Sequence, residues 1–279
     1  MLEIRNKEGL TEKEFLQQYN PGDYERPSVT VDTILFALNE KMDSLKILLV
    51  KRKDHPFINC WAFPGGFVDI KESSHEAAIR ELKEETGLDN VYVEQLYTYT
   101  NPKRDPRMRI IDIAYFALLD HIPNVSGHDD ASDAAWFDVS LKDDKLKIIS
   151  IEKNVRIEYD LTKTNYKHGK IEVSGYVEPV LQSNSNSKLA FDHTEILVDC
   201  ILRIRNKIEY TDLIFNLMPD RFTLTDLQRV YELVLDKSLY KKNFRVTISD
   251  CVEPTDDKMI PVTSLGTKPA VLYKYSKNN

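Results

Sequence analysis

The residues of this chain that are best arranged for chemistry are three glutamates within one short stretch, Glu81, Glu84 and Glu85. Ser73 and Glu76 have the spacing of a capping box, and no glycine or proline interrupts the residues that follow, so a helix is predicted over 73–86. At about 100° per residue the three carboxylates share one face of this helix, apart from its apolar side chains. The helix therefore presents a concentrated patch of negative charge.

Such a patch is better explained by a bound cation than by solvent alone. Like charges three and four residues apart each destabilise a helix by a few tenths of a kcal/mol, and carboxylate oxygens are ligands that Mg²⁺ or Mn²⁺ prefers. A divalent ion held there would bridge phosphate oxygens, neutralise charge that develops during a reaction, and lower the pKa of a bound water. The alternative is a solvated amphipathic helix that is merely acidic.

Residues just before and within the helix favour the metal site. Glu72 is placed to reach Arg80 and hold it as a brace. Gly65 and Gly66 carry no Cβ, so the backbone can pass close to the ion. Together with the preceding Trp61–Gly65 run, these residues form a pattern far more specific than an acidic helix.

The segments that must position this helix are rich in strand-forming residues. Val29–Leu38 and Leu45–Lys51 are β-prone runs joined by a polar turn, which predicts a hairpin. Further strands are expected at Val91–Thr100, Ile110–Leu119 and Ala134–Val139. We therefore expect a sheet with the acidic helix packed on it.

Residues 140–188 differ in character. Their β-prone segments predict a β-hairpin excursion, and the polar run Ser183–Lys188 predicts a mobile loop. After this loop, Asp192 and Glu195 have capping-box spacing and open an amphipathic helix that extends to Ile208. This helix leads out of the first domain, to which we assign residues 1–208.

Residues 209–279 have the pattern of a compact second domain. A short helix is expected at Leu213–Leu217, a second helix opens at Thr225, and a third lies at Lys241–Asp250. Two β-prone runs then flank a turn, Met259–Thr263 and Ala270–Tyr275. Three small helices followed by a hairpin predict a winged helix-turn-helix domain.

Composition limits the class of protein. The 279 residues, with 42% hydrophobic and 30% charged content, suit two domains that each bury a core. No apolar stretch approaches the roughly 18 residues of a membrane span, and the first residues have mixed charge. We therefore expect a cytoplasmic protein without a signal peptide or membrane contact. The three cysteines are widely spaced and odd in number, which favours reduced thiols, and neither they nor the six histidines show zinc spacing.

Formal charge is distributed unevenly. The chain carries a net charge of −7, but the residues from 210 onward contain ten basic and nine acidic side chains. The acidic first domain discourages non-specific nucleic-acid binding, whereas the second domain permits it.

Three stretches of the chain resemble known families. The register of Gly66, Glu72, Arg80 and the three glutamates, completed by Gly87 and Leu88, resembles the Nudix box. NPKRDPRMRIIDIAYFAL and LAFDH resemble the ADP-ribose pyrophosphatase branch of that superfamily. FTLTDLQRVYELVLDKSLYKKNFR resembles the winged helix of Nudix-related transcriptional regulators of NAD metabolism. The resemblance implies an α+β fold, a Nudix α/β/α sandwich with a mixed sheet followed by a small winged helix-turn-helix domain.

The Nudix resemblance also implies roles for individual residues. It assigns the metal ion to the Gly66 carbonyl and the carboxylates of Glu81, Glu84 and Glu85, with Arg80 and Glu72 orienting them. It places three charged residues in a loop that helps to shape an ADP-ribose pocket, Arg104, Asp105 and Arg107. The alternative for this loop is a charged turn around Pro106.

The winged-helix resemblance implies contacts with double-stranded DNA. Cationic side chains would meet phosphates, and Asn or Arg would reach base edges in the major groove. The residues concerned are Lys241, Lys242, Asn243 and Arg245 in the recognition-helix region and Lys268 and Lys274 on the wing. The alternative is a solvated helix face.

Two functions remain in competition. The first is Mg²⁺-dependent hydrolysis of the diphosphate of ADP-ribose or a related nucleoside diphosphate derivative. The second is a transcriptional regulator whose Nudix domain senses such a nucleotide without significant turnover. The intact set of glutamates favours the hydrolase, fused to a DNA-binding winged helix. Because two-fold operators require recognition helices about 34 Å apart, we also expect a homodimer.

Overall fold

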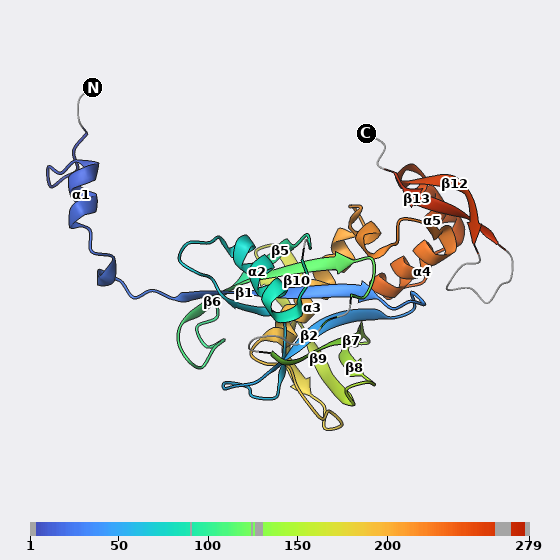
Figure 1. Cartoon of the computed structure of the whole chain (residues 1–279), viewed down its shortest axis with the longest axis horizontal. Coiled ribbons are helices and arrows are strands. Elements are labelled where there is room, and N and C mark those ends of the chain that lie inside the picture. Colours follow the sequence, from blue (N-terminus) through green and yellow to red (C-terminus); the bar gives the residue numbers. More distant parts are fainter. Residues whose placement is uncertain (1–3, 90, 124, 126–130, 260–268, 277–279) are drawn as a thin grey trace.

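The computed structural model describes residues 4–89, 91–123, 125, 131–259 and 269–276 (Figure 1). The α-helices among these residues are α1 (Glu12–Gln18), α2 (Ser74–Thr86), α3 (His193–Lys207), α4 (Leu224–Leu235) and α5 (Lys241–Thr247). Short 3₁₀ turns are η1 (Pro21–Asp23), η2 (Leu213–Leu217) and η3 (Ser249–Cys251). The strands of the first sheet are β1 (Ser28–Leu38), β2 (Leu45–Arg52), β3 (Trp61–Ala62), β4 (Gly65–Phe67), β5 (Glu94–Tyr99), β6 (Ile110–Leu119), β7 (Ala131–Lys142), β8 (Lys145–Ser150), β9 (Val155–His168) and β10 (Ile171–Leu181). A second, smaller sheet contains β11 (Phe222–Thr223), β12 (Val252–Met259) and β13 (Ala270–Tyr275).

The large sheet is mixed, as predicted. Its strand order is β10-β9-β8-β7-β2-β1-β6-β5, with β3 paired to β2 and β4 paired to β1. β1 runs parallel to β6, whereas the other pairs are antiparallel. The predicted pairing of the first two β-prone runs is present in the β1–β2 hairpin. This arrangement places β1 in the interior of the sheet, where helices can cover both of its faces.

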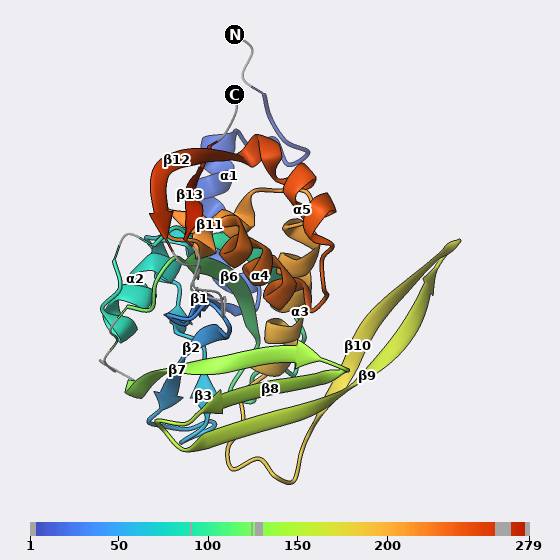
Figure 2. The same ribbon diagram turned by 90° about the vertical axis from the view of Figure 1, so that its right-hand side faces the viewer.

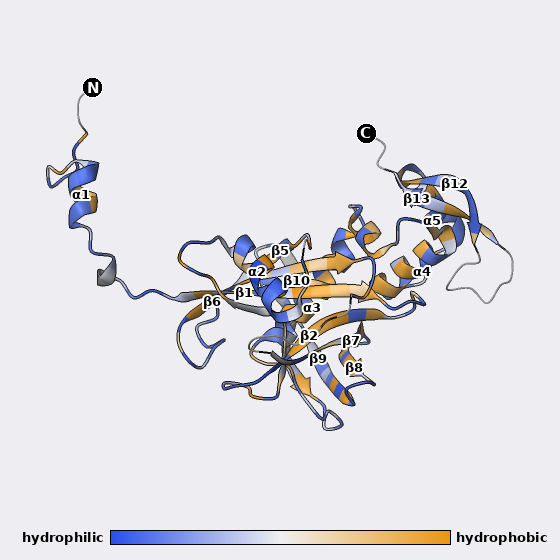
Figure 3. Cartoon of the chain, in the orientation of Figure 1, coloured by the Kyte–Doolittle hydropathy of each residue, from blue (hydrophilic) through white to orange (hydrophobic). Residues whose placement is uncertain are grey.

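β1 shows how the sequence produces three layers. Side chains alternate across a strand, so neighbouring residues face opposite sides of the sheet. Ile34 and Phe36 belong to the core cluster that includes α3, whereas Val31 and Leu35 belong to clusters that include α2. All four are fully buried. Burial on both faces explains why the second half of this strand, residues 34–38, is uninterrupted in apolar residues. Figure 3 shows these apolar residues concentrated in the central strands.

α2 forms where capping predicted it. The Ser73 side chain accepts a hydrogen bond from the Glu76 N–H, and the Glu76 carboxylate accepts one from the Ser73 N–H. The helix ends at Gly87, whose φ of 77° is the left-handed conformation that glycine adopts without strain. Its inner face buries Ala77, Ala78 and Leu82 against the sheet. The glutamates are therefore held on a helix with two fixed ends.

The segment expected to be a hairpin excursion continues the large sheet. β8, β9 and β10 follow β7 as antiparallel neighbours, and Figure 2 shows the β9–β10 hairpin extending beyond the body of the domain. The stretch 183–188, which we expected to be mobile, is anchored along its length. Asn186 exchanges hydrogen bonds with the backbone of Arg156, and the Lys188 carbonyl accepts one from the Trp61 N–H.

α3 begins as expected, but not for the expected reason. Asp192 is the N-cap residue, yet its side chain makes no capping hydrogen bond, so the predicted capping box is wrong. Its carboxylate instead accepts two hydrogen bonds from the Arg104 guanidinium, at 2.9 and 2.7 Å. Two hydrogen bonds from a cationic guanidinium are stronger than one from a neutral backbone N–H, which explains the outcome. The start of α3 is thereby tied to the loop between β5 and β6.

The C-terminal domain has the predicted winged-helix architecture. α4 is capped by Thr223, and α5 packs on it through the rings of Tyr231 and Phe244, with centroids 5.3 Å apart. The first wing strand occupies Val252–Met259, so it begins seven residues before the predicted run. Its sequence, VEPTDDKM, is too polar to be recognised as a strand, and its pairing with β13 supplies the extended conformation. Residues 260–263 of the predicted run lie outside the described residues.

The hydrophobic core continues from the Nudix-like sheet into the winged helix. One cluster includes Phe36 of β1, Ile204 of α3 and Val230 of α4. At the opposite end of the chain, α1 projects away from the body and contains no buried residue (Figure 1). Among the residues described, no helix combines the length and the apolar character that crossing a membrane requires.

Candidate nucleotide and metal site with a DNA-binding surface

The acidic face of α2 lies against the glycine pair of β4. Gly65 donates its N–H to the Glu85 carboxylate at 2.9 Å, and Glu85 is almost completely buried. A Cβ placed on Gly66 would lie within 2.7 Å of all three atoms of the Glu81 carboxyl group. The absence of a side chain at Gly66 therefore creates the space that Glu81 occupies.

Arg80 connects the residues of this face. Its guanidinium forms ion pairs with Glu72 at 2.6 Å, Glu81 at 2.8 Å and Glu84 at 2.9 Å. The contact with Glu72 that the spacing suggested is thus present. Hydrogen bonds from Arg80 and from the Asp69 N–H lower the pKa of Glu72 to about 2, while burial raises the pKa of Glu81.

These residues have the chemistry to hold a hard divalent cation. The face offers carboxylate oxygens at Glu81, Glu84 and Glu85, and the lack of a Cβ at Gly66 lets the backbone of β4 lie directly against Glu81. Within the described ranges, no three acidic, histidine or cysteine side chains are already gathered around one point. Arg80 accounts for this, because it holds Glu81 and Glu84 in ion pairs. An ion would have to displace at least one of these pairs.

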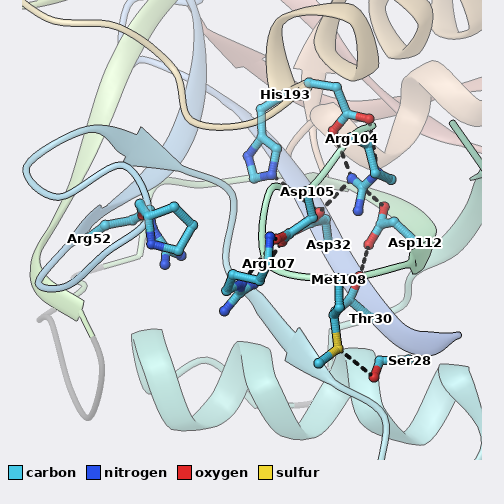
Figure 4. A network of polar contacts seen from close by, with 12 residues as sticks. Ser28, Thr30, Asp32, Arg52, Arg104, Asp105, Arg107, Met108, Asp112 and His193 are labelled. Atoms are coloured by element: carbon cyan, nitrogen blue, oxygen red, sulfur yellow. Dashed lines mark hydrogen bonds and ion pairs between the residues drawn. The ribbon is translucent and has the colours of Figure 1, made fainter. Parts of the chain in front are cut away.

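A second set of charged residues lies beneath this face, in the centre of the sheet (Figure 4). Asp32 of β1 and Asp112 of β6 are both buried, and Arg104 lies 3.8 Å from each. His193 of α3 places Nε2 3.3 Å from Asp32. Its Nδ1 accepts a hydrogen bond from the Phe63 N–H at 3.1 Å, so the ring proton lies on Nε2 and faces the carboxylate.

The pKa values of the two buried aspartates are shifted in opposite directions. Burial and the neighbouring charge of Asp32 raise the pKa of Asp112 well above its usual range. Burial also raises the pKa of Asp32, but its contacts with His193 and Arg104 outweigh burial and lower it. Asp112 Oδ1 accepts a hydrogen bond from Thr30 at 2.9 Å, while its buried Oδ2 has no hydrogen-bond partner among the described residues.

The predicted substrate loop borders the same cavity. Asp105 accepts two hydrogen bonds from the Arg107 guanidinium, at 3.1 and 2.8 Å, so these residues form a rigid charged pair. Arg104 is almost fully buried by its pairing with Asp192. The cavity has a volume of about 780 Å³ and runs from the glutamates of α2 to Arg107. All the predicted metal-binding and substrate-binding residues thus line one cavity, and so does Arg80. Glu72 does not line it but pairs with Arg80.

Several residues of this cavity carry no assignment from the sequence. They are Asp32, Arg52, Phe191 and His193, and the same holds for Asp112 and Asp192, which lie next to Arg104 without lining the cavity. Asp32 and Asp112 had a recognisable signal, since an acidic residue inside an apolar strand is costly to bury without a purpose. Phe191 and His193 stand within the LAFDH motif, but the histidine is isolated in sequence.

The predicted DNA-binding residues of α5 are all exposed, and its three cationic side chains line one shallow hollow. The predicted residues are Lys241, Lys242, Asn243 and Arg245. Lys274 of β13 is also exposed but forms an ion pair with Glu253 at 3.3 Å, which neutralises part of its charge. Lys268 lies outside the described residues. The exposed face of α5 is thus cationic, while its buried Phe244 fixes the helix to α4.

The fold and the site define a Nudix domain joined to a winged helix. The NUDIX domain profile matches residues 28–150, and the NrtR DNA-binding winged helix domain profile matches residues 214–275. The ADPR responsive transcriptional repressor NtrR of Acinetobacter baylyi is 33% identical over 270 residues, which cover 95% of this chain and 89% of that protein. The chain therefore belongs to the NrtR family of Nudix proteins with a C-terminal winged helix.

Of two further relatives, one matches about half of this chain and the other most of it. An ADP-ribose pyrophosphatase of Methanocaldococcus jannaschii is 41% identical over 137 residues, covering 49% of this chain and 75% of that protein. The crystal structure of Shewanella oneidensis NrtR complexed with a 27mer DNA superposes with a TM-score of 0.61 at 28% identity. That superposition covers 89% of this chain and 93% of the other.

Proposed function

We propose that the Nudix domain hydrolyses the diphosphate of ADP-ribose or a related nucleoside diphosphate derivative in a reaction that depends on Mg²⁺ or Mn²⁺. The observation that carries this proposal is the complete carboxylate face of α2 against Gly66. A domain that only binds a nucleotide has no need for three glutamates on one helix face, which cost helix stability. The M. jannaschii pyrophosphatase supports the choice of substrate class.

The residues of the site have two roles, because some would hold the metal ion and others would contact the substrate. Glu81, Glu84, Glu85 and the Gly66 carbonyl would hold the ion, which would supply charge neutralisation and a more acidic water. Arg80, braced by Glu72, keeps the glutamates oriented and balances their charge in the absence of the ion. Arg107, locked to Asp105, presents a cation at the far wall of the cavity.

The alternative is a sensor that binds the nucleotide and releases it unchanged. The ion pairs of Arg80 with Glu81 and Glu84 favour this reading, because they occupy two of the carboxylates that a metal would need. The repressor from A. baylyi, which aligns with nearly the whole chain, favours it as well. Both functions would use the same cavity, so a measurement of whether the bound nucleotide is hydrolysed distinguishes them.

A panel of nucleotides with and without Mg²⁺, with products identified, tests the hydrolase directly. ADP-ribose, other nucleoside diphosphate sugars and dinucleotides form the panel. We expect Mg²⁺-dependent release of AMP from ADP-ribose and its loss in Glu84→Gln, which keeps the side-chain volume and removes the charge. Binding without product across the whole panel would leave the sensor as the function.

We further propose that the winged helix binds double-stranded DNA as part of a homodimer. The cationic face of α5 carries this proposal, since Arg245 and its neighbours are exposed while Phe244 anchors the helix. Lys274, and Lys268 beyond the described residues, would add phosphate contacts from the wing. Arg245→Ala should weaken binding to a palindromic fragment and lower the salt slope by about 1 if Arg245 contacts a phosphate. If the wild-type protein fails to shift its own upstream DNA, this part of the proposal is wrong.

A further inference from the structure

A second cavity, with a volume of about 440 Å³, lies where the two domains meet. The Nudix domain contributes the ends of β1 and β7 and the last turns of α3, and the winged helix contributes the last turns of α4 and the residues that follow it. Figure 2 shows α3 beside α4 at this junction. None of the described residues that line this cavity also lines the nucleotide cavity. The junction cavity is thus a separate space, of a size typical of small-molecule sites, which are frequent at domain interfaces.

Much of the lining of the junction cavity is apolar. Both domains supply buried aliphatic and aromatic side chains, namely Phe36 of β1, Val139 of β7, Ile201 and Ile204 of α3 and Val234 of α4. These residues belong to the hydrophobic core that continues from one domain into the other. A ligand with an apolar body can therefore pack against both domains at once.

The charged groups of the lining are mainly cationic. Four basic residues, Lys142, Arg205, Arg229 and Lys237, accompany two carboxylates, Glu232 and Asp236. Both carboxylates have partners within the protein. Asp236 forms an ion pair with Lys142 at 3.6 Å, and Glu232 accepts hydrogen bonds from the Leu239 N–H and the Gln228 side chain at 2.8 and 3.1 Å. The lining has an excess of positive charge, which favours an anionic ligand.

Arg229 is the cation best suited to bind that anion. Arg205 donates to the Val234 carbonyl at 2.8 Å, so it links the domains and compensates the negative end of α4. Lys237 pairs with Glu209 at 2.6 Å. The guanidinium of Arg229, by contrast, has no hydrogen bond or ion pair among the residues that the structure describes. A guanidinium presents parallel N–H groups that match the two oxygens of a carboxylate.

We propose that the junction cavity binds a small organic acid, whose carboxylate pairs with Arg229 and whose apolar body packs between α3 and α4. This site is distinct from the proposed nucleotide site and does not depend on it. Because both domains line the cavity, the bound acid would contact the junction that joins the Nudix domain to the DNA-binding helices.

Three probes that share one ring and differ in the attached group test the site: benzoate, benzyl alcohol and benzylamine. Ligand-observed NMR titrations with the full chain should show that the wild type prefers benzoate to benzyl alcohol by roughly 5- to 30-fold. This ratio corresponds to about 1–2 kcal/mol at about 1.4 kcal/mol per tenfold, a value between a solvated ion pair and a buried charged hydrogen bond. Benzylamine, a cation at neutral pH, should bind most weakly. Arg229→Gln should bring the ratio of benzoate to benzyl alcohol close to one, and Arg229→Lys should retain part of it.

Arg203→Gln is the matched control, because Arg203 is an exposed arginine of α3 that does not line the cavity. It should leave the preference for benzoate unchanged. The proposal is wrong if the wild type binds none of the probes at millimolar concentration, or if Arg229→Gln keeps the full preference. An equal loss in Arg203→Gln would also overturn it, since the preference would then reflect the overall charge of the protein alone.

Discussion

Replacement of Gly66 by alanine separates the chemistry of the site from the stability of the fold. The new Cβ would lie within 2.7 Å of the whole Glu81 carboxyl group, whereas ordinary contact begins at 3.4 Å. The carboxyl group must therefore retreat by roughly 1 Å, and a misplacement of that size can lower turnover by about 100-fold. No backbone atom is among the three nearest obstacles, so the rest of the domain has no reason to move.

The stability of the same variant should change little. Glu81 is a flexible side chain that keeps part of its ion pair with Arg80, and partly exposed pairs contribute at most about 1 kcal/mol. Gly65→Ala offers the opposite case, because its Cβ would collide with the Val31 carbonyl and lie 2.9 Å from the Cα of Asp32. Backbone atoms cannot retreat as a side chain does, so we expect a loss of about 1–3 kcal/mol or more.

The assay compares Mg²⁺-dependent AMP release from ADP-ribose with urea unfolding for each variant. Gly169→Ala is the control, since this glycine has a φ of 63° in the distant β9–β10 turn and open space around it. It should lose up to about 1–2 kcal/mol from the left-handed conformation and retain full turnover. Wild-type turnover in a folded Gly66→Ala protein would refute the reasoning, because Glu81 would then not need its position.

Three further predictions concern the network and the domain junction. Asp112→Asn should stabilise the protein at neutral pH, because a raised folded-state pKa gives stability that is present below the unfolded pKa and lost as pH rises toward the folded one. Unfolding curves from pH 3 to 8 should therefore show a gain that grows with pH, and a constant difference would contradict the raised pKa of Asp112. Arg205→Met removes hydrogen bonds to the Val234 carbonyl of α4 and the Leu141 carbonyl of β7, at 2.8 and 2.6 Å. It should cost about 1–3 kcal/mol and alter DNA affinity, whereas the exposed Arg203→Met should do neither. Thr223→Ala deletes the buried cap of α4 and should cost about 1–2 kcal/mol in thermal unfolding, with Thr223→Ser retaining most of the stability.

The sequence predicted best the features that depend on neighbours along the chain. α2 is specified by the reciprocal caps of Ser73 and Glu76, and its spacing alone places Glu81, Glu84 and Glu85 on one face. The β1–β2 hairpin and the helices of the winged domain have similarly local signals. The contact of Glu72 with Arg80 spans eight residues, which is still within reach of one helix end.

Features that depend on distant partners could not be predicted in the same way. Asp32 and His193 meet across more than 150 residues of sequence, and only the sheet brings β1 beside the start of α3. Asp192 looked like a helix cap because its competitor, Arg104, lies 88 residues away. β12 is polar along its length and becomes a strand through its pairing with β13. In each case tertiary context outweighed the local pattern.

The fate of ADP-ribose in a single turnover tests the central claim most directly. Excess protein would be mixed with ADP-ribose and Mg²⁺, quenched at intervals, and the nucleotides separated and identified. The carboxylate face of α2 predicts conversion to AMP and ribose 5-phosphate, with no conversion in the presence of a chelator or in Glu84→Gln. Recovery of intact ADP-ribose that had remained bound throughout would contradict hydrolysis and identify the domain as a sensor.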